Sequence, residues 1–364
     1  MSATRLDLHG LTREELRALF ARWDFSPVHA ARLWNYLYLA LADSFSAEAM
    51  PDLPEKVRAR LRMETRIGSL PIARETDSSD GFTRKYLLSL TDGEAIETVL
   101  MRFTGRVTAC VSSQVGCAMG CVFCASGQAG LQRGLTASEV VAQVLISKTY
   151  LKPNEELKNL VFMGMGEPLH HYEETARAIR LLTHPAARGM SPRRITVSTV
   201  GLVPGIARLG ADFGGKVGLA VSLHAPNDVI RDRIMPMNRK FPIVELMRAL
   251  REYPLPMRRR ITIEYTLMNG VNDGEAEARE LVQLLRGLRV KVNLIPMNPI
   301  SASELKAPSG ARVAAFQRVL SESGVSCFVR TRRGDEVSAA CGQLAIADDL
   351  VRKKRERDAL REKS

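Results

Sequence analysis

The 364-residue sequence is 45% hydrophobic and 25% charged, which is typical of a globular protein and excludes collagenous, low-complexity and largely disordered chains. Lys and Arg outnumber Asp and Glu by 52 to 40, and this excess favours a polyanionic partner, with nucleic acid first. The N-terminus lacks a signal-peptide pattern, and the longest apolar stretch, residues 33–42, is too short to span a bilayer. We therefore predict a cytoplasmic protein without membrane contact.

Two amphipathic helices are predicted near the N-terminus. The first begins with a possible capping box of Thr12 and Glu15, and the second carries Trp34 and two tyrosines. We expect residues 1–67 to form a small helical accessory domain. Its basic and aromatic side chains would suit RNA, although packing of the aromatic side chains in the core explains them equally well.

A β-rich connector is predicted over residues 68–109. Two strand-like runs, residues 82–90 and 94–103, are separated by a Thr-Asp-Gly turn signal. Glu97 lies in the second run, where simple alternation could place it on a solvated face.

From residue 110 onward, strands rich in Val, Ile and Leu alternate with helices, which indicates a parallel sheet buried on both faces. The predicted strands are residues 159–165, 194–200, 216–224, 260–268, 290–298 and 326–331. The predicted helices are residues 138–151, 173–182, 204–209, 244–253, 275–288 and 312–323, and the first of these has a capping box of Thr136 and Glu139. The fold class is thus α/β, a partial (βα)6 barrel over residues 110–342, followed by a basic tail over residues 343–364.

Three of the six cysteines, Cys117, Cys121 and Cys124, form a C-x3-C-x2-C cluster. Three thiolates that converge on one point suit a metal centre, and three ligands leave a position open for a substrate or cofactor, as a catalytic metal requires. A structural zinc site whose fourth ligand comes from a distant Cys or His remains an alternative.

Short polar or glycine-rich motifs follow most of the predicted strands. They are GMGEP (164–168), STVG (198–201), SLHAPND (222–228), MNGVND (268–273) and IPMNP (295–299). Because active sites of parallel α/β barrels form at the carboxyl ends of the strands, we expect these motifs and the cysteine loop to meet around one cavity.

The ordered set of motifs resembles the radical S-adenosylmethionine (SAM) superfamily and, more narrowly, the RNA adenine methyltransferases of the RlmN and Cfr family. The resemblance implies a [4Fe-4S] cluster held by Cys117, Cys121 and Cys124, with SAM on its open iron. The positions that match SAM contacts are Gly166, Glu167, Ser198, Ser222, Leu223, His224 and Asn298.

The resemblance also implies a mechanism. In the family, one SAM methylates a cysteine, and a second SAM is cleaved to a 5′-deoxyadenosyl radical that takes hydrogen from this S-methyl group. The methylene radical adds to adenine, and a second cysteine releases the product through a transient disulfide. Cys341 matches the methylated cysteine (the S-methylcysteine intermediate), Cys110 the resolving one and Glu97 the proton acceptor, whereas Cys327 matches nothing and is expected in the core.

The implied substrates are 23S rRNA and tRNA, methylated at C2 of a specific rRNA adenine and of adenine 37 in tRNA. The target base has to leave its stack, so unpaired RNA is the expected context. The implied electron donor is a protein such as flavodoxin or ferredoxin, and we expect a monomer. Two alternatives remain: Cfr-like methylation at C8, and a non-enzymatic, zinc-stabilised RNA-binding protein.

Overall fold

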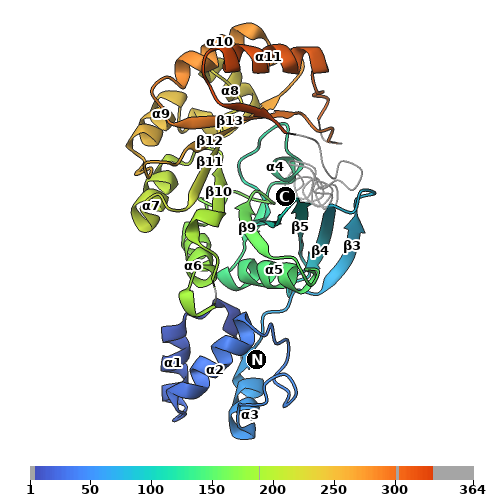
Figure 1. Cartoon of the computed structure of the whole chain (residues 1–364), viewed down its shortest axis with the longest axis vertical. Coiled ribbons are helices and arrows are strands. Elements are labelled where there is room, and N and C mark those ends of the chain that lie inside the picture. Colours follow the sequence, from blue (N-terminus) through green and yellow to red (C-terminus); the bar gives the residue numbers. More distant parts are fainter. Residues whose placement is uncertain (1–4, 188, 301–302, 331–364) are drawn as a thin grey trace, which may run out of the picture.

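The structure, a computed structural model, describes residues 5–187, 189–300 and 303–330 (Figure 1). Its lower part is a helical group that begins with a two-stranded parallel sheet. The elements are β1 (Leu6–Asp7), α1 (Arg13–Arg22), α2 (Pro27–Tyr38), α3 (Glu55–Glu64) and β2 (Thr65–Arg66). The predicted capping box is confirmed, since Thr12 and Glu15 each accept a hydrogen bond from the other's backbone N–H.

The aromatic residues of α2 mainly build the core of this helical group. Trp34 is fully buried and stacks on Tyr38, with the ring centroids 4.3 Å apart. Tyr36 is only half-buried, and its hydroxyl donates to Asp52. The interpretation of core packing is therefore correct for Trp34 and Tyr38, which are not available to RNA.

A ten-stranded mixed sheet occupies the rest of the molecule, in the order β14-β13-β12-β11-β10-β9-β6-β5-β4-β3. Its strands are β3 (Ile72–Asp77), β4 (Thr83–Ser89), β5 (Ala95–Phe103), β6 (Arg106–Val111), β9 (Leu157–Phe162), β10 (Ile195–Thr199), β11 (Gly218–Ser222), β12 (Ile261–Leu267), β13 (Val290–Pro296) and β14 (Cys327–Val329). The strands β3 to β6 pair antiparallel, and β6 and β9 to β14 pair parallel. The predicted α/β fold with a parallel sheet is confirmed.

Helices connect the parallel strands, as the alternating pattern predicts. They are α5 (Ala137–Thr149), α6 (Tyr172–Leu182), α7 (Val203–Phe213), α8 (Asp228–Ile234), α9 (Ile243–Glu252), α10 (Glu275–Leu284) and α11 (Gly310–Glu322). Short 3-10 turns are also present at Leu8–Gly10, Pro185–Ala187, Pro192–Arg194 and Pro236–Arg239. The helix α7 extends four residues beyond the predicted 204–209 segment, to its left-handed C-cap at Gly214.

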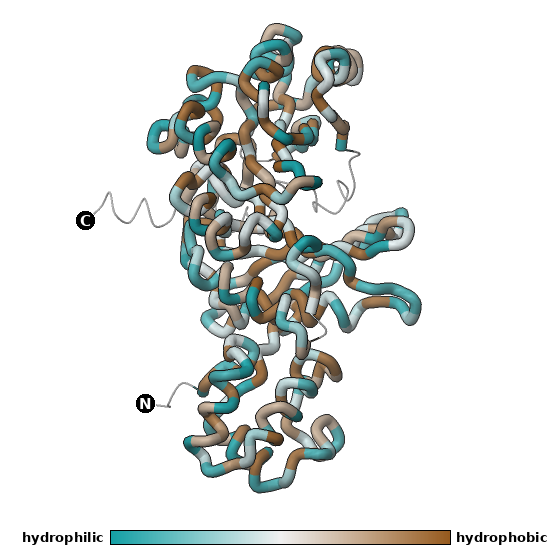
Figure 2. The backbone as a smooth tube through the Cα atoms, turned by 60° about the vertical axis from the view of Figure 1, so that its left-hand side comes forward, coloured by the Kyte–Doolittle hydropathy of each residue, from teal (hydrophilic) through white to brown (hydrophobic). Residues whose placement is uncertain are grey.

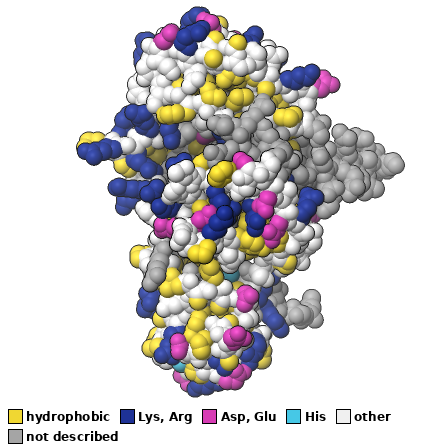
Figure 3. Space-filling model, turned by 45° about the vertical axis from the view of Figure 1, so that its right-hand side comes forward, with side chains coloured by type: hydrophobic (Ala, Val, Ile, Leu, Met, Phe, Trp, Pro, Cys, Tyr) yellow, Lys and Arg dark blue, Asp and Glu magenta, His cyan; other side chains and the backbone are white. Residues whose placement is uncertain are grey.

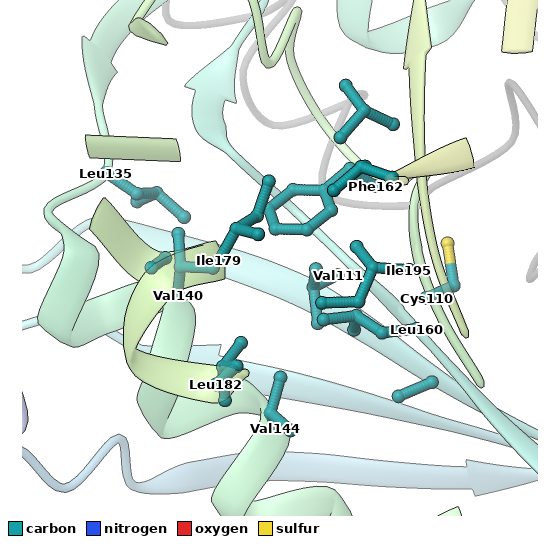
Figure 4. Packing of buried hydrophobic residues seen from close by; sticks show 14 of the residues in the cluster. Cys110, Val111, Leu135, Val140, Val144, Leu160, Phe162, Ile179, Leu182 and Ile195 are labelled. Atoms are coloured by element: carbon teal, nitrogen blue, oxygen red, sulfur yellow. The ribbon is translucent and has the colours of Figure 1, made fainter. Parts of the chain in front are cut away.

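One face of the sheet packs against these helices. Figure 4 shows Val111, Leu160 and Phe162 from β6 and β9 facing Val140 of α5 and Ile179 of α6. All five side chains are at most 1% exposed. This apolar layer stabilises the sheet through burial, and it leaves the opposite face to carry the polar residues.

The opposite face can be followed from strand to strand by register, because directly paired residues point to the same side. Val99 of β5 pairs with Cys110 of β6, which pairs with Val161 of β9. Val161 in turn pairs with Thr196 of β10, and Ser198 lies two residues further on. We call this side the inner face.

The hydrophilic colours of Figure 2 dominate the loops that project from the molecule, while many brown segments run through its middle. In the part of the chain that the structure describes, no helix is both long enough and apolar enough to cross a membrane.

Candidate functional site

The cysteine loop begins at a short hairpin of β7 (Gln114–Gly116) and β8 (Leu131–Gly134) and includes the helix α4 (Ala125–Ala129). Gly116 has a φ of +75°, and a Cβ at this position would collide with the carbonyl oxygen of Gly130. The next residue, Cys117, donates its N–H to that same oxygen at 3.1 Å. A glycine is therefore required for the hairpin to close and start the cysteine loop.

The same loop brings the three clustered cysteines to one wall of a cavity that is partly open to solvent and has a volume of about 970 Å³, open solvent included. The other walls come from the ends of β9, β10, β11, β12 and β13. The predicted residues that line it are Cys117, Cys121, Cys124, Gly166, Glu167, Ser198, Ser222, His224 and Asn298. Four of the five strand-end motifs thus meet around this cavity with the cysteine loop, as expected. No residue of the fifth motif, 268–273, is among the lining residues, and its Asn272 instead donates to the carbonyl of His224 at 2.7 Å.

Leu223 is placed differently from its neighbours. Its side chain is fully buried in the hydrophobic core. Its N–H donates to the carbonyl of Glu264, and its own carbonyl accepts a hydrogen bond from Arg231. The structure therefore brings Ser222 and His224 to the cavity but not the Leu223 side chain.

The cysteine thiols of the cavity are chemically suited to bind a metal centre. Burial raises the pKa of Cys117 to about 12 and that of Cys121 well above the ordinary thiol value, and the neighbouring Cys124 raises both further. Binding of iron would stabilise the thiolates and release their protons. Among the described residues, no three His, Cys, Asp or Glu side chains are arranged to hold a single ion, whereas the cysteines of a [4Fe-4S] cluster each bind a different iron atom.

Glu167 joins the ends of two strands. Its Oε1 accepts a hydrogen bond from the Leu169 N–H at 3.0 Å, and its Oε2 accepts one from the Val200 N–H at 2.8 Å. Its own N–H donates to Gln114 at 2.9 Å. Burial raises the pKa of Glu167 to about 7, against these hydrogen bonds, which lower it. The carboxylate is thus held in place at the cavity wall, where a positively charged ligand group would stabilise its ionised form.

His224 contributes a neutral imidazole to the cavity. Its φ of +56° is unusual for a residue other than glycine. Burial, with the nearby Arg231, lowers its pKa to about 3, and its Nδ1 accepts the Thr266 N–H at 2.8 Å. With Nδ1 as acceptor, the single proton of the neutral ring is on Nε2, which makes this atom a hydrogen-bond donor.

Arg231 and Glu264 have no predicted role, and they lie outside the five strand-end motifs. Arg231 is 1% exposed and donates to the carbonyls of Leu223, Val200 and Ser222 and to Asn238. Glu264 lines the cavity and accepts a hydrogen bond from Asn293 at 2.8 Å, and burial raises its pKa. For Glu264 the available signal is a charged residue in an otherwise apolar strand, whereas Arg231 lies among other charged residues of α8 and gives no such signal.

Glu97 and Cys110 lie outside the cavity lining but on the same inner face. Cys110 is 9% exposed and pairs with Val99, two residues after Glu97. Glu97 is fully buried and forms a 3.0 Å ion pair with Lys85 of β4. The alternative that Glu97 points to solvent is therefore wrong. Cys341 lies outside the described residues, and Cys327 is half-buried against the core.

The amino-acid sequence matches one protein family and many RNA methyltransferases. A family profile described as the radical SAM superfamily matches residues 111–282. The chain is 55% identical over 332 residues to the dual-specificity RNA methyltransferase RlmN of Sorangium cellulosum (strain So ce56), covering 82% of this chain and 85% of the relative. It is 48% identical over 344 residues to RlmN 1 of Myxococcus xanthus (strain DK1622), covering 94% and 95%.

A solved structure is similar over nearly the whole chain. The crystal structure of a radical SAM methyltransferase from Sphaerobacter thermophilus superposes with a TM-score of 0.90 at 45% identity. The superposition covers 93% of this chain and 99% of the solved one. The similarity therefore includes the helical group and the antiparallel strands as well as the parallel sheet.

Proposed function

Because the chain belongs to the RlmN family of radical SAM RNA methyltransferases, we propose that it methylates C2 of a specific adenine in 23S rRNA and C2 of adenine 37 in tRNA. It is an enzyme that acts on RNA, and its cofactors are a [4Fe-4S] cluster and SAM. The observation that best supports the proposal is the cavity that gathers the cysteine cluster and four of the five strand-end motifs. The alternative of a non-enzymatic zinc-stabilised protein is not supported.

Cys117, Cys121 and Cys124 would hold the cluster. Cys117 and Cys121 are buried and Cys124 is half-buried, and the three thiols line one wall of the cavity. They leave the opposite wall to polar residues that a second ligand could contact. When bound, the cluster supplies an electron for the reductive cleavage of SAM, which gives a carbon-centred radical. Ring carbons of adenine require such a reagent because they are too electron-poor to attack a methylsulfonium.

SAM would bind along the strand ends. Gly166 has a φ of +97° and no room for a Cβ beside Gln114, so the backbone runs close to the cavity. The Glu167 carboxylate can accept a hydrogen bond from the ammonium group of SAM, and the hydroxyls of Ser198 and Ser222 offer further polar contacts. His224 donates from Nε2, and Asn298 completes this set of donors and acceptors.

The proposed acid–base and thiol chemistry takes place further along the inner face. Glu97 Oε1 lies 3.0 Å from Lys85 Nζ, and this carboxyl group would accept the proton that leaves the adenine adduct. Cys110 lies on β6, the strand next to the one that carries Glu97. Its thiol would act as the resolving partner of Cys341. Formation of the Cys110–Cys341 disulfide would break the bond between Cys341 Sγ and the methylene carbon, which leaves with the electron pair and takes up a proton to become the methyl group of the base.

We further propose the roles of the domains, the electron donor, the location and the oligomeric state. The helical domain over residues 1–67 contributes to RNA binding, the β-rich connector covers residues 68–109, and the catalytic domain covers residues 110–342. A flavodoxin or ferredoxin supplies electrons in the cytoplasm, and the enzyme acts as a monomer.

The test is RNA methylation by the anaerobically reconstituted enzyme, followed by digestion and mass spectrometry. We expect 2-methyladenosine from rRNA and tRNA, none with Cys341→Ala, and undiminished product with the matched variant Cys327→Ala. Product at 8-methyladenosine alone would overturn the assignment to C2. Methylation by Cys341→Ala would overturn the role of this cysteine.

A further inference from the structure

The strands of the barrel carry a dense group of basic residues at the end opposite the cavity. Short segments there precede β10, β11, β12 and β13. The exposed basic residues of these segments are Arg193, Arg194, Lys216, Arg258, Arg260, Arg286 and Arg289. We call this set the amino-end rim. On the face shown in Figure 3, Lys and Arg side chains gather at one edge of the barrel part.

Two arginines join the segments of the rim into one surface. Arg259 donates to the carbonyls of Arg193 and Lys216, both at 3.3 Å, so the starts of β10, β11 and β12 lie together. Arg289 donates to the carbonyls of Leu255 and Pro256, at 2.6 and 3.1 Å, and attaches the start of β13. The positive charges therefore lie on one contiguous surface, although they are far apart in the sequence.

An open groove runs along part of this surface. Five arginines line it (Arg258, Arg259, Arg260, Arg286 and Arg289), and no Asp or Glu is among the described lining residues. In the described part of the chain, no salt bridge joins a rim residue to an acid. Met257 is 86% exposed and Phe328 is 59% exposed at the same groove. Arginines with exposed apolar and aromatic side chains fit phosphates and unstacked bases.

We propose that the amino-end rim is a second RNA-binding surface, which holds the sugar-phosphate backbone of the substrate at a distance from the target adenine. This inference rests on the proposed function. The cavity lies at the carboxyl ends of the same strands, and a strand of seven residues such as β12 separates the two ends by about 20 Å. An RNA that occupies both sites has to extend past the barrel, so the rim binds long substrates and not an isolated stem-loop.

The position of the rim favours RNA over an acidic electron-donor protein. Electron transfer requires a close approach to the cluster cysteines, which lie at the other end of the strands. An RNA chain has no such restriction, because its phosphates repeat along its whole length.

The experiment compares two RNAs, full-length tRNA and its isolated anticodon stem-loop, by fluorescence anisotropy with the full-length reconstituted enzyme. The rim variant replaces Arg258, Arg260 and Arg286 with Gln, which leaves the carbonyl contacts of Arg259 and Arg289 intact. The matched control replaces three other exposed arginines, Arg248, Arg279 and Arg318, with Gln and changes the net charge equally.

We expect the rim variant to bind full-length tRNA about tenfold more weakly at 0.1 M salt, and the slope of log K against log salt to fall by about 2 to 3. The ratio of the affinities for tRNA and stem-loop should fall in the rim variant and stay constant in the control. Equal losses for both RNAs, or an unchanged affinity for tRNA, would overturn the proposal. The proposal would also be overturned if the rim variant bound RNA normally but its cluster was reduced more slowly by flavodoxin. Binding needs no turnover, so failure of the proposed methylation would appear separately, as absent product with wild-type enzyme.

Discussion

The buried pair of Lys85 and Glu97 allows a quantitative test of how the inner face is stabilised. Lys85 Nζ and Glu97 Oε1 are 3.0 Å apart, and the two side chains are 4% and 0% exposed. Removal of one partner of such a pair costs about 3 to 5 kcal/mol, because the other charge stays buried, whereas apolar replacement of both is often close to neutral. We expect Lys85→Met and Glu97→Leu each to lower the free energy of unfolding by about 3 kcal/mol, near the low end of that range, because a lone buried group can neutralise by changing its protonation.

The measurement is a double-mutant cycle from urea unfolding followed by circular dichroism. The double variant should recover most of the lost free energy of unfolding, with a coupling energy of at least about 3 kcal/mol. The matched control is the ion pair between Arg84, the residue before Lys85 on β4, and Asp77 of β3. Arg84 Nε and Asp77 Oδ1 are 2.6 Å apart, and the side chains are 27% and 49% exposed. Its coupling energy should be below about 1 kcal/mol, as for other surface pairs. Equal coupling in the two cycles would refute the argument from burial.

Three further predictions concern the cavity. Cys124→Ala should lose most of the iron and the visible absorbance of the reconstituted cluster while far-UV circular dichroism stays unchanged; full iron content would contradict the assigned ligand set. Arg231→Met should lower the free energy of unfolding by about 3 kcal/mol or more in urea titrations, because two buried and two partly buried acceptors lose their donor; a change below about 1 kcal/mol would argue against this role. The pKa of His224 is lowered from 6.5 to about 3, so the unfolded state binds the extra proton and stability is lost as pH falls below 6.5. The control is His224→Asn, because Asn tolerates the same backbone conformation. Below pH 6.5 the free energy of unfolding of the wild-type enzyme should fall by about 1.4 kcal/mol more per pH unit than that of the variant. Parallel curves of unfolding free energy against pH would show that His224 does not cause this loss.

Much of the catalytic half follows from local patterns in the sequence. Hydrophobic periodicity identifies the βα repeats, and the shared polarity of parallel strands predicts that residues after the strands, such as Ser198 and His224, meet at one end. The spacing of the cysteines needs no tertiary information. These features are local in the chain, or they follow from strand direction alone.

The pairing of distant strands is less accessible to sequence reasoning. The turn signals of residues 68–109 predict hairpins, but they do not reveal that β6 continues as a parallel neighbour of β9, 46 residues after the end of β6 at Val111. This pairing decides that Glu97 and Cys110 share the inner face with the cavity. The role of Arg231 was equally hidden, since its acceptors are carbonyls that only the assembled strand ends bring together.

The buried polar side chains of the inner face lower the stability of the fold unless each has a partner, and this requirement is explained by the function of the face. Buried polar side chains such as Glu97, Thr266 and Glu264 are stable only when each is paired or hydrogen-bonded, and an apolar sheet face would fold with fewer constraints. The face lies against a cavity whose proposed contents, a zwitterionic cofactor and an adenine, themselves carry donors and acceptors. Polar groups that are held rigidly by Arg231 and the strand ends can meet these ligands without reorganisation. We therefore expect substitutions on this face to separate into those that lower stability in the empty enzyme, as at Lys85, and those that weaken cofactor binding alone, as at Ser222.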